Sequence, residues 1–373
     1  MTTVAVVGGR LQGIEAVYLA KKAGFHSLLV DKDPKAPASG LCGEVGIFDV
    51  LKKGRPLIDF LKKADFILPA LENDEVHGAL LEISEEHGLK LAFDIQAYAI
   101  SSSKLKSDRL MRERRVPAPR YFPDCGGPYI VKPSGESGSA GVFRAETEDE
   151  VRRFLAKADA PFDWIVQEYL AGPSYSIEII GFPGTYRTYE VTEIHMDEDY
   201  DCKMVTAPCL ISGRKKEEFS EIAVSLANMV GLSGIMDVEV IDHDGELKVL
   251  EIDARIPSQT PTAVYHSSGA NLLSELAGIA VSGKFPEDSP KKQRFAAVEH
   301  YLIDETGAHG KGEHIMGEGG PLTYREKFFG ADEALSDYSD GRVPWRGTFI
   351  NSGETVEELN QKRSEMLHML SGG

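Results

Sequence analysis

Cysteine is scarce in this chain of 373 residues, which has four: Cys42, Cys125, Cys202 and Cys209. None belongs to a CxxC pair or has histidines at zinc-ligand spacing, so we expect reduced thiols rather than a zinc site or a disulfide framework. No segment approaches 18 consecutive apolar residues, which argues against a membrane-spanning helix. The N-terminus lacks the basic and apolar segments of a signal peptide, so we expect a cytoplasmic protein.

Positive charge is also in short supply. The chain has 41 lysines and arginines against 59 aspartates and glutamates, which gives a formal net charge of -18. A surface this acidic repels polynucleotide phosphates, so nucleic acid is not an expected partner. A polyphosphate ligand would need a local group of basic side chains or a metal ion. Composition leaves the oligomeric state open.

The first 95 residues have the pattern of a Rossmann-like domain with a parallel sheet. Strands are predicted at 4–7, 27–30, 65–69 and 90–93, with helices at 11–23 and 76–87. Apolar strands that alternate with amphipathic helices are typical of α/β units. Open sheets of this kind bind ligands at the carboxyl ends of their strands. We therefore expect Leu11, Gln12 and Glu72 to line a ligand pocket.

The remainder has a mixed α+β pattern. We expect a second domain over 96–295, with a lid subdomain at about 125–170, and a small C-terminal α+β unit over 296–373. Helices are predicted at 104–115 and 148–156, and strands at 129–132, 142–144, 164–170, 175–181, 187–194 and 234–253.

A tight glycine turn, Gly8-Gly9-Arg10-Leu11-Gln12-Gly13, connects the first predicted strand and helix. The dinucleotide-binding fingerprint requires glycine where Arg10 stands. Three interpretations stay open: a simple connecting turn, a dinucleotide site that uses Asp31, and a second nucleotide held by Arg10 and Asp31.

A loop of small residues over 134–141 follows the strand that ends in Lys132. Its N–H groups, together with the hydroxyls of Ser137 and Ser139, are suited to closing over phosphates. Lys104 and Lys132 would supply the local positive charge that the acidic chain otherwise lacks.

The most informative segment, 234–255, is predicted to form a β-hairpin. A three-residue loop over 243–245 would place Asp237 opposite Glu251 and Glu239 opposite Val249. Residues that face each other, or lie two apart, share a side of the sheet. The segment therefore predicts one acidic face and one apolar face. The acidic face comprises Asp237, Glu239, Glu251 and Asp253, and the apolar face comprises Met236, Val238, Val240, Leu250 and Ile252.

Four carboxylates on one face repel one another, and an oxygen-seeking divalent cation would remove that repulsion. Mg²⁺ prefers one or two carboxylates together with phosphate oxygens. We therefore predict that Glu239, Glu251 and Asp253 bind Mg²⁺, rather than form a solvated surface. Arg255 follows on the same face, where it could hold a terminal phosphate.

These features together resemble the ATP-grasp superfamily of carboxylate–amine ligases over about residues 95–295. The resemblance implies that Lys104 and Lys132 hold ATP phosphates and that the hairpin acids hold two Mg²⁺ ions. It also implies that Gln167, Glu168, Tyr169 and Leu170 contact the nucleotide. Two departures stand out, because many members have Asn where Asp253 stands, and no acid follows Gly172 closely to bind ribose.

A closer resemblance, covering residues 1 to about 280, is to the branch of the superfamily that acts in pyrrolysine biosynthesis. It is carried by the segments 7–13, 31–34, 200–206 and 251–262, including the run Ser258-Gln-Thr-Pro-Thr262. The resemblance implies two substrates, 3-methyl-D-ornithine and L-lysine, and an acyl-phosphate intermediate. The expected catalytic residues are Arg255 and Lys132, and the further substrate contacts are Glu178, Asp201, Ser258, Thr260 and Thr262.

Three alternatives remain at this point: another amino-acid ligase of the superfamily, a dinucleotide-dependent oxidoreductase, and a non-catalytic nucleotide-binding regulator. The group that deprotonates the lysine amine is also open, with Glu72 and Asp201 as candidates.

Overall fold

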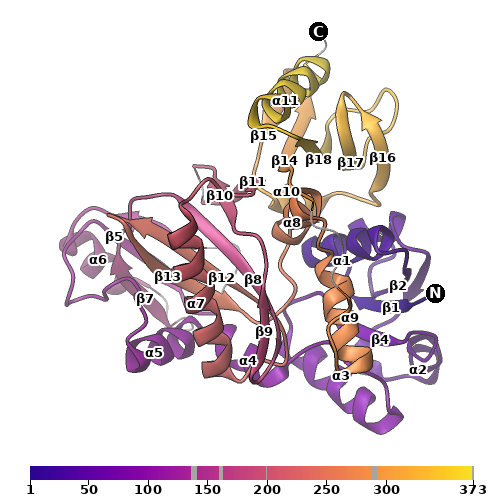
Figure 1. The fold of residues 1–373 in the computed structure, drawn as a ribbon, viewed down its shortest axis with the longest axis horizontal. Helices are drawn as coiled ribbons and strands as arrows, with labels where there is room; N and C mark the ends of the chain where they lie inside the picture. Colours follow the sequence, from indigo (N-terminus) through magenta and orange to yellow (C-terminus); the bar gives the residue numbers. More distant parts are fainter. Residues whose placement is uncertain (136–140, 159–162, 199, 288–291, 372–373) are drawn as a thin grey trace.

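The computed structural model describes residues 1–135, 141–158, 163–198, 200–287 and 292–371. Figure 1 shows an N-terminal domain at the right, a long central sheet with a small lobe at the left, and the C-terminal strands at the top. Within the described ranges, no helix combines the length and the apolar character needed to cross a membrane.

The N-terminal domain is built on a parallel sheet of strand order β3-β2-β1-β4. Its elements are β1 (Thr3–Val7), α1 (Leu11–Lys22), β2 (His26–Asp31), β3 (Glu44–Ile47), α2 (Arg55–Leu61), β4 (Phe66–Pro69) and α3 (Asp74–His87), with short 3₁₀ turns at Pro37–Gly40 and Val50–Lys52. Val4 and Val6 pack with α1 on one face, while Ala5 and Val7 pack with α2 and α3 on the other. Because both faces are covered, these strands are apolar throughout, and the predicted parallel sheet is confirmed.

Two local expectations fail in this domain. The predicted strand at 90–93 is wrong, because the described structure there has only an isolated bridge between Ile67 and Leu91. The sheet instead gains β3, which the sequence analysis missed. This edge strand has no apolar run, and its Val45 and Ile47 are exposed.

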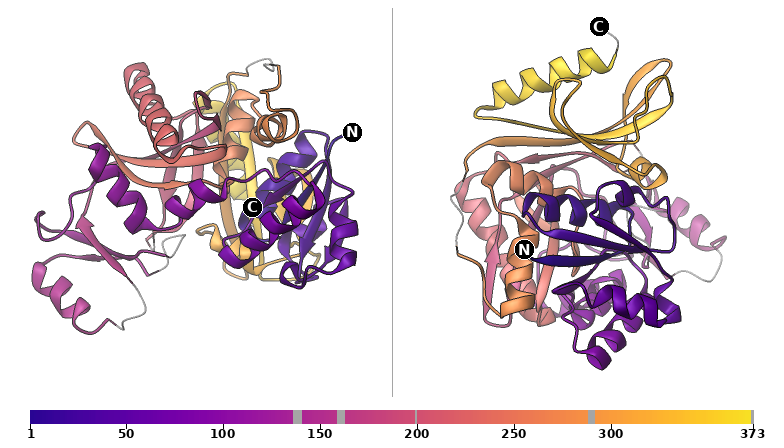
Figure 2. Two further views of the ribbon diagram at one scale, coloured as in Figure 1. Left: turned by 90° about the horizontal axis from the view of Figure 1, so that it is seen from below. Right: turned by 90° about the vertical axis from the view of Figure 1, so that its right-hand side faces the viewer.

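A small lobe, termed the lid lobe, follows helices α4 (Ile95–Ser101) and α5 (Lys104–Arg114). It consists of β5 (Tyr129–Pro133), β6 (Phe143–Ala145), α6 (Glu148–Leu155) and β7 (Trp164–Glu168), with sheet order β6-β5-β7. Figures 1 and 2 show that this lobe projects from the end of the molecule opposite the N-terminal domain.

The central sheet is antiparallel, with order β13-β12-β8-β10-β11-β14-β18-β17-β16, and β9 and β15 pair with β8 and β14. Its first part contains β8 (Ser174–Phe182), β9 (Thr185–Thr188), β10 (Thr192–Met196), β11 (Cys202–Ala207), α7 (Gly213–Val230), β12 (Gly234–His243), β13 (Glu246–Asp253), α8 (Thr260–Ser268) and α9 (Leu272–Ser282). Helix α7 covers one face of the β12–β13 hairpin with Phe219, Ala223 and Leu226. The predicted single strand over 187–194 is wrong, because β9 and β10 are separate strands that pair with different parts of β8.

The C-terminal part extends the same sheet. It contains β14 (Phe295–Asp304), β15 (Gly307–Gly310), α10 (His314–Glu318), β16 (Thr323–Phe328), β17 (Ala331–Ser336), β18 (Trp345–Gly353) and α11 (Val356–Leu370). Strand β14 pairs with β11 on one side and with β18 on the other. Helix α11 lies over β14 and β18 at the outer end of the molecule (Figure 2).

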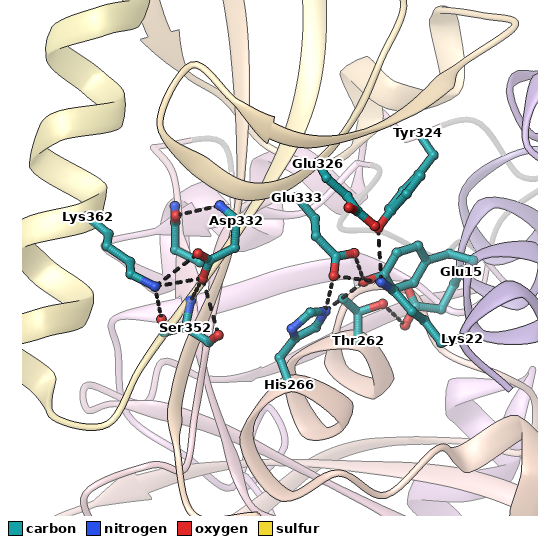
Figure 3. A network of polar contacts seen from close by, with 12 residues as sticks. Glu15, Lys22, Thr262, His266, Tyr324, Glu326, Asp332, Glu333, Ser352 and Lys362 are labelled. Carbon is teal, nitrogen blue, oxygen red and sulfur yellow. Dashed lines mark hydrogen bonds and ion pairs between the residues drawn. The ribbon is translucent and has the colours of Figure 1, made fainter.

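A half-buried polar network joins the N-terminal domain, helix α8 and the C-terminal part (Figure 3). The Glu333 carboxylate of β17 pairs with Lys22 Nζ of α1 at 2.6 Å and accepts a hydrogen bond from Tyr18 at 2.7 Å. The same Tyr18 hydroxyl lies 2.6 Å from Nε2 of His266 on α8. Because a buried charge is costly without its partner, this network favours one relative placement of the three parts.

Candidate active site

The turn of the β12–β13 hairpin differs from the prediction. His243 pairs with Glu246, so the loop contains two residues, Asp244 and Gly245, instead of three. Both have positive φ, +51° and +89°, as expected for the Asp-Gly turn that suits the twist of a hairpin. The predicted pairs, Asp237 with Glu251 and Glu239 with Val249, are therefore wrong.

A β-bulge restores the predicted acidic face. The ladder pairs Val240 with Val249 but Glu239 with Glu251, so Leu250 is an extra residue in β13. Bulges of this kind re-aim the side chains that follow them. Asp237 then pairs with Asp253, and the four acids share one face. Leu250 leaves the predicted apolar face and lines a cavity beside Glu251.

The acids are enclosed, and burial together with mutual repulsion raises the pKa of three of them. Burial, followed by the charges of Glu251, Asp237 and Asp253, raises the pKa of Glu239 well above its usual value. Burial is also the main cause that raises the pKa of Asp237 to about 7 and that of Asp253 to about 6. Such a cluster would bind a cation favourably.

Two lysines lie beside the acids. The Lys104 ammonium is 3.3 Å from Oε2 of Glu251. The backbone N–H of Lys104 donates to the Ser134 carbonyl at 3.1 Å, which ties the start of α5 to the end of β5, where Lys132 lies. Lys132 is buried, which lowers its pKa, and the charges of Lys104 and Lys132 oppose burial and lower the pKa of Glu251.

These groups line a cavity of about 390 Å³ between the lid lobe and the hairpin, termed the lid cavity. Its walls include eight of the predicted residues: Lys104, Lys132, Gln167, Glu168, Tyr169, Leu170, Glu239 and Glu251. Apolar side chains, among them Ile130, Val142 and Leu250, form another part of the wall. The predicted contacts Ser137 and Ser139 lie outside the described residues.

The Glu168 side chain already has protein partners. Although burial opposes it, hydrogen bonds from Arg120 and Lys248 lower the pKa of Glu168 to about 2. Arg120 Nε and Lys248 Nζ each lie 2.9 Å from the Glu168 carboxylate. Glu168 therefore fixes the end of β7, while its neighbours Tyr169 and Leu170 line the cavity beyond the strand.

A chain of contacts connects the hairpin to the N-terminal domain. Arg255 Nη2 lies 2.7 Å from Oε1 of Glu72 and 3.2 Å from Oδ2 of Asp253. Gln12 donates to the same Glu72 oxygen at 2.9 Å. Leu11, Gln12 and Glu72 line a cleft of about 940 Å³, termed the N-terminal cleft, which also reaches Lys104 and Asp253.

A neighbouring cleft of about 770 Å³ follows the glycine turn and includes Arg10 and Asp31 in its walls. Asp31 Oδ2 accepts a hydrogen bond from the Gly9 N–H at 2.8 Å, and its Oδ1 accepts one from the Asp33 N–H at 2.8 Å. Asp31 thus shapes the turn itself. A second nucleotide in this cleft stays a prediction.

A third enclosed space, termed the acid cavity, has a volume of about 110 Å³. Predicted residues in its wall are Asp201, Glu239, Glu251, Asp253, Arg255, Ser258 and Thr260. Two other predicted contacts lie behind it. Thr262 donates to Glu15 of α1 at 2.7 Å, and Glu178 is fully buried beside Asp237, with which it pairs in the β8–β12 ladder.

Sequence reasoning missed several residues of these walls. Glu193 and His195 of β10 line the lid cavity, and Tyr98 lines the N-terminal cleft. Glu313, which directly precedes α10, lines the acid cavity. Alternation along β10 was the available signal for Glu193 and His195, whereas no local pattern singles out Glu313.

A divalent cation fits this donor set only with help from a ligand. Among the described residues, no three His, Cys, Asp or Glu side chains are arranged to bind a metal ion by themselves. Mg²⁺ needs only one or two carboxylates when phosphate oxygens complete its shell. The crowded acids, whose burial and repulsion raise the pKa of Glu239, suit a cation, and the adjacent lysines suit a polyphosphate that binds together with it.

The comparisons with known sequences agree with this geometry. A family model described as ATP-grasp domain matches residues 101–259. The 3-methyl-D-ornithine--L-lysine ligase of Methanosarcina acetivorans is 40% identical over 83% of this chain and 82% of its own length. The enzyme of the same name from Methanosarcina barkeri is 38% identical over 99% of this chain and 98% of its own.

Solved structures with low sequence identity share the fold. An L-amino acid ligase from Bacillus licheniformis superposes with a TM-score of 0.69 at 14% identity, covering 98% of this chain and 97% of that one. N5-carboxyaminoimidazole ribonucleotide synthetase from Thermus thermophilus has a TM-score of 0.72 at 17% identity, covering 99% and 98%. The chain belongs to the ATP-grasp family and, within it, to the family of 3-methyl-D-ornithine–L-lysine ligases.

Proposed function

We propose that this chain joins the carboxylate of 3-methyl-D-ornithine to the ε-amine of L-lysine with release of ADP and phosphate. The observation that carries the proposal is the similarity to the Methanosarcina barkeri enzyme, which extends over nearly the whole of both chains. The lid cavity supports the ATP-dependent part of the proposal. Its two lysines and its acids are suited to phosphates and Mg²⁺, and the apolar wall beside them is suited to a nucleotide base.

The reaction has two steps. Transfer of the γ-phosphoryl group of ATP to the methylornithine carboxylate gives an acyl phosphate, and attack by the lysine amine then forms the amide and expels phosphate. Mg²⁺, bound as two ions by Glu239, Glu251 and Asp253, would neutralise charge on the phosphates. Lys104 and Lys132 would bind the phosphates directly, as positioning and charge neutralisation require.

The two amino acids have separate places. Glu239 and Glu251 line both the lid cavity and the acid cavity, so a carboxylate in the acid cavity lies next to the phosphate site. The N-terminal cleft adjoins the acid cavity, because Glu251 and Asp253 line both. Lysine would enter through this cleft past Gln12 and Glu72. The lysine amine has an unperturbed pKa of ~10.4, so its ammonium form must give up a proton to a nearby group before it attacks. Glu72 and Asp201 remain the proposed acceptors.

The test is an ADP-release assay with each amino acid alone and with both together, followed by mass spectrometry of the product. We expect ADP and an amide product only when a diamino-acid carboxylate donor and L-lysine are both present with Mg²⁺. ADP release without an amide product, or the same release with either amino acid omitted, would refute the proposal.

A further inference from the structure

The acid cavity holds more negative charge than the proposed metal site requires. Besides Glu239, Glu251 and Asp253, its wall contains Asp201, Asp237 and Glu313. Among the described residues of that wall, Arg255 is the one lysine or arginine, and it already pairs with Glu72 and Asp253. The cavity volume of about 110 Å³ is several times the space that one water molecule needs. The cavity thus has room for a cationic group of a substrate.

Glu313 is held rigidly at this cavity by its own backbone segment. Its N–H donates to the Cys202 carbonyl at 2.9 Å. On either side, Gly312 N–H donates to Asp197 at 3.2 Å and His314 N–H donates to Asp201 at 3.2 Å. A Cβ atom on Gly312 would lie 1.9 Å from an Asp201 oxygen, so only glycine permits this close approach. The C-terminal part therefore delivers Glu313 to one defined position.

The Glu313 carboxylate lies against the segment between β13 and α8. Burial raises the pKa of Glu313, and the side chains of Ser258 and Gln259 lie close enough to lower it in part. Gln259 has φ of +67°, and its Oε1 lies 2.7 Å from His300 Nε2, which leaves its NH₂ group for Glu313. The backbone N–H of Gln259 donates to Glu15 at 3.2 Å. A non-glycine residue at positive φ is strained, and it keeps this conformation only when its surroundings hold it there. Gln259 therefore has one fixed position in the wall of the acid cavity.

An independent observation also indicates a polar ligand. The Thr260 side chain is 5% exposed and lines the acid cavity. Burial raises the pKa of the neighbouring Glu178 to about 8, and Thr260 lies close enough to lower it in part. Neither the Glu178 carboxyl nor the Thr260 hydroxyl has a hydrogen-bond partner of normal length and angle among the described residues. Unsatisfied buried polar groups are costly unless a ligand completes them.

The cavity has two different ends. Glu239 and Glu251 are shared with the lid cavity, so the substrate carboxylate that receives a phosphoryl group belongs at that end. Glu313 does not line the lid cavity. In a diamino acid, the group farthest along the chain from the carboxylate is the side-chain ammonium. Placing the carboxylate at the shared end therefore directs this ammonium toward Glu313.

We propose that Glu313 is a specificity-determining residue that binds the side-chain ammonium of the diamino acid whose carboxylate is activated. This inference rests on the proposed function. Asp201 pairs with the His314 side chain at 2.8 Å and accepts from the His314 N–H, so it also holds the Glu313 segment in place, whether or not it accepts the lysine proton. A site with a buried carboxylate discriminates strongly against an analogue that lacks the matching group, because the carboxylate is then left unpaired.

The experiment compares two carboxylate donors of equal chain length, D-ornithine and D-norvaline, which lacks the side-chain amine. Steady-state kinetics with saturating ATP, Mg²⁺ and L-lysine are measured for the wild type, Glu313→Gln and Glu305→Gln. Glu305 is an exposed residue in the turn between β14 and β15, so it controls for the loss of one negative charge in the same region. We expect Glu313→Gln to lower kcat/KM for D-ornithine at least about 10-fold, with kcat/KM for D-norvaline unchanged or raised.

A direct binding measurement covers the case in which D-norvaline turnover is too slow to quantify. Calorimetry in the presence of Mg²⁺ and a non-hydrolysable ATP analogue should show at least about 10-fold weaker D-ornithine binding to Glu313→Gln. Affinity for the ATP analogue and for D-norvaline should not change. Equal losses for both donors, or unchanged D-ornithine binding, would overturn the inference while leaving the proposed function intact. A wild type that forms no amide with any diamino acid would overturn both.

Discussion

Glu239 of β12 lies directly opposite Glu251 of β13, and the bulge at Leu250 makes them partners. Cross-strand neighbours of like charge destabilise a sheet, and here the next pair on the same face, Asp237 and Asp253, is also acidic. The folded chain therefore keeps a repulsive arrangement, which Lys104 and Arg255 offset in part and which a bound cation would relieve further. Several consequences of this arrangement and of its surroundings can be measured.

Single acid-to-amide changes in the hairpin should abolish ligation, and two of them should slightly stabilise the ligand-free protein. For Glu239→Gln and Asp253→Asn, whose pKa values are raised by burial and by neighbouring acids, we expect a gain of about 0.5–1 kcal/mol in the free energy of unfolding, because repulsion is reduced. Glu251→Gln should give no such gain, because Lys104 and Lys132 lower the pKa of Glu251 against its burial. Mg²⁺-dependent ADP release should be lost, because fewer ligands remain for the ion. A melting curve and an ADP-release assay measure both quantities.

Glu246→Gln at the exposed start of β13 is the matched control and should change neither quantity. Full activity in both Glu251→Gln and Asp253→Asn would contradict the metal assignment and, with it, the ATP-dependent mechanism.

Replacement of the buried Lys132 by methionine should separate activity from stability. Lys132→Met removes a positive charge that burial already disfavours, so we expect a nearly unchanged melting temperature. Turnover should fall at least about 10²-fold, as for the loss of other groups that stabilise developing charge. Lys104→Met should lose turnover to a similar extent but melt at a lower temperature, because the charges of Glu251 and Asp253 raise the pKa of Lys104 against its burial. Lys157→Met, at an exposed site of the lid lobe, is the control. An active Lys132→Met enzyme would mean that the lid cavity binds no phosphate.

Glu72→Gln should affect lysine more than ATP. Glu72 is held between Gln12 and Arg255 at the N-terminal cleft, away from the lid cavity. We expect KM for L-lysine to rise about 10-fold or more, with KM for ATP changed less than about 2-fold, because one charge-assisted contact is lost. Initial-rate kinetics with each substrate varied in turn measure the two constants, and Glu85→Gln on the exposed face of α3 is the control. A parallel rise in both constants would argue against the lysine assignment.

The pH dependence of stability should reveal Glu15. Burial raises the pKa of this residue from 4.5 to about 7, against hydrogen bonds from Thr262 and Gln259 that lower it. Its protonated form therefore contributes stability that is fully present below pH 4.5 and is lost as the pH rises through 7. At 1.36 kcal/mol for each pH unit, this loss amounts to about 3 kcal/mol at most.

Glu15→Gln removes the titrating group. Its free energy of unfolding, relative to that of the wild type, should therefore increase between pH 5 and pH 8. Denaturant unfolding of both proteins at these two pH values measures the difference. A constant difference across the range would show that Glu15 ionises normally in the folded protein.

The sequence by itself determined the elements with strong local patterns. The apolar strands β1 and β2, the helix between them, the lysine at the end of β5 and the acidic face of the hairpin all follow from side-chain periodicity. The Asp244-Gly245 pair also predicts a two-residue turn, and a longer loop was inferred instead. In a regular ladder, only a loop with an odd number of residues would place all four acids on one face.

Only the tertiary structure decided how the acids converge and what surrounds them. With a two-residue turn and a regular ladder, Glu251 and Asp253 would face the core that α7 covers. The bulge at Leu250 prevents this. Val240 and Val249 pack in the core under α7 before the bulge, and Ile252 packs in the same core after it, so Leu250 is left as the extra residue. Nor does any local pattern place Glu313 beside Ser258 and Gln259. That contact depends on the C-terminal strands continuing the central sheet and on Gly312 fitting against Asp201, and both are properties of the whole fold.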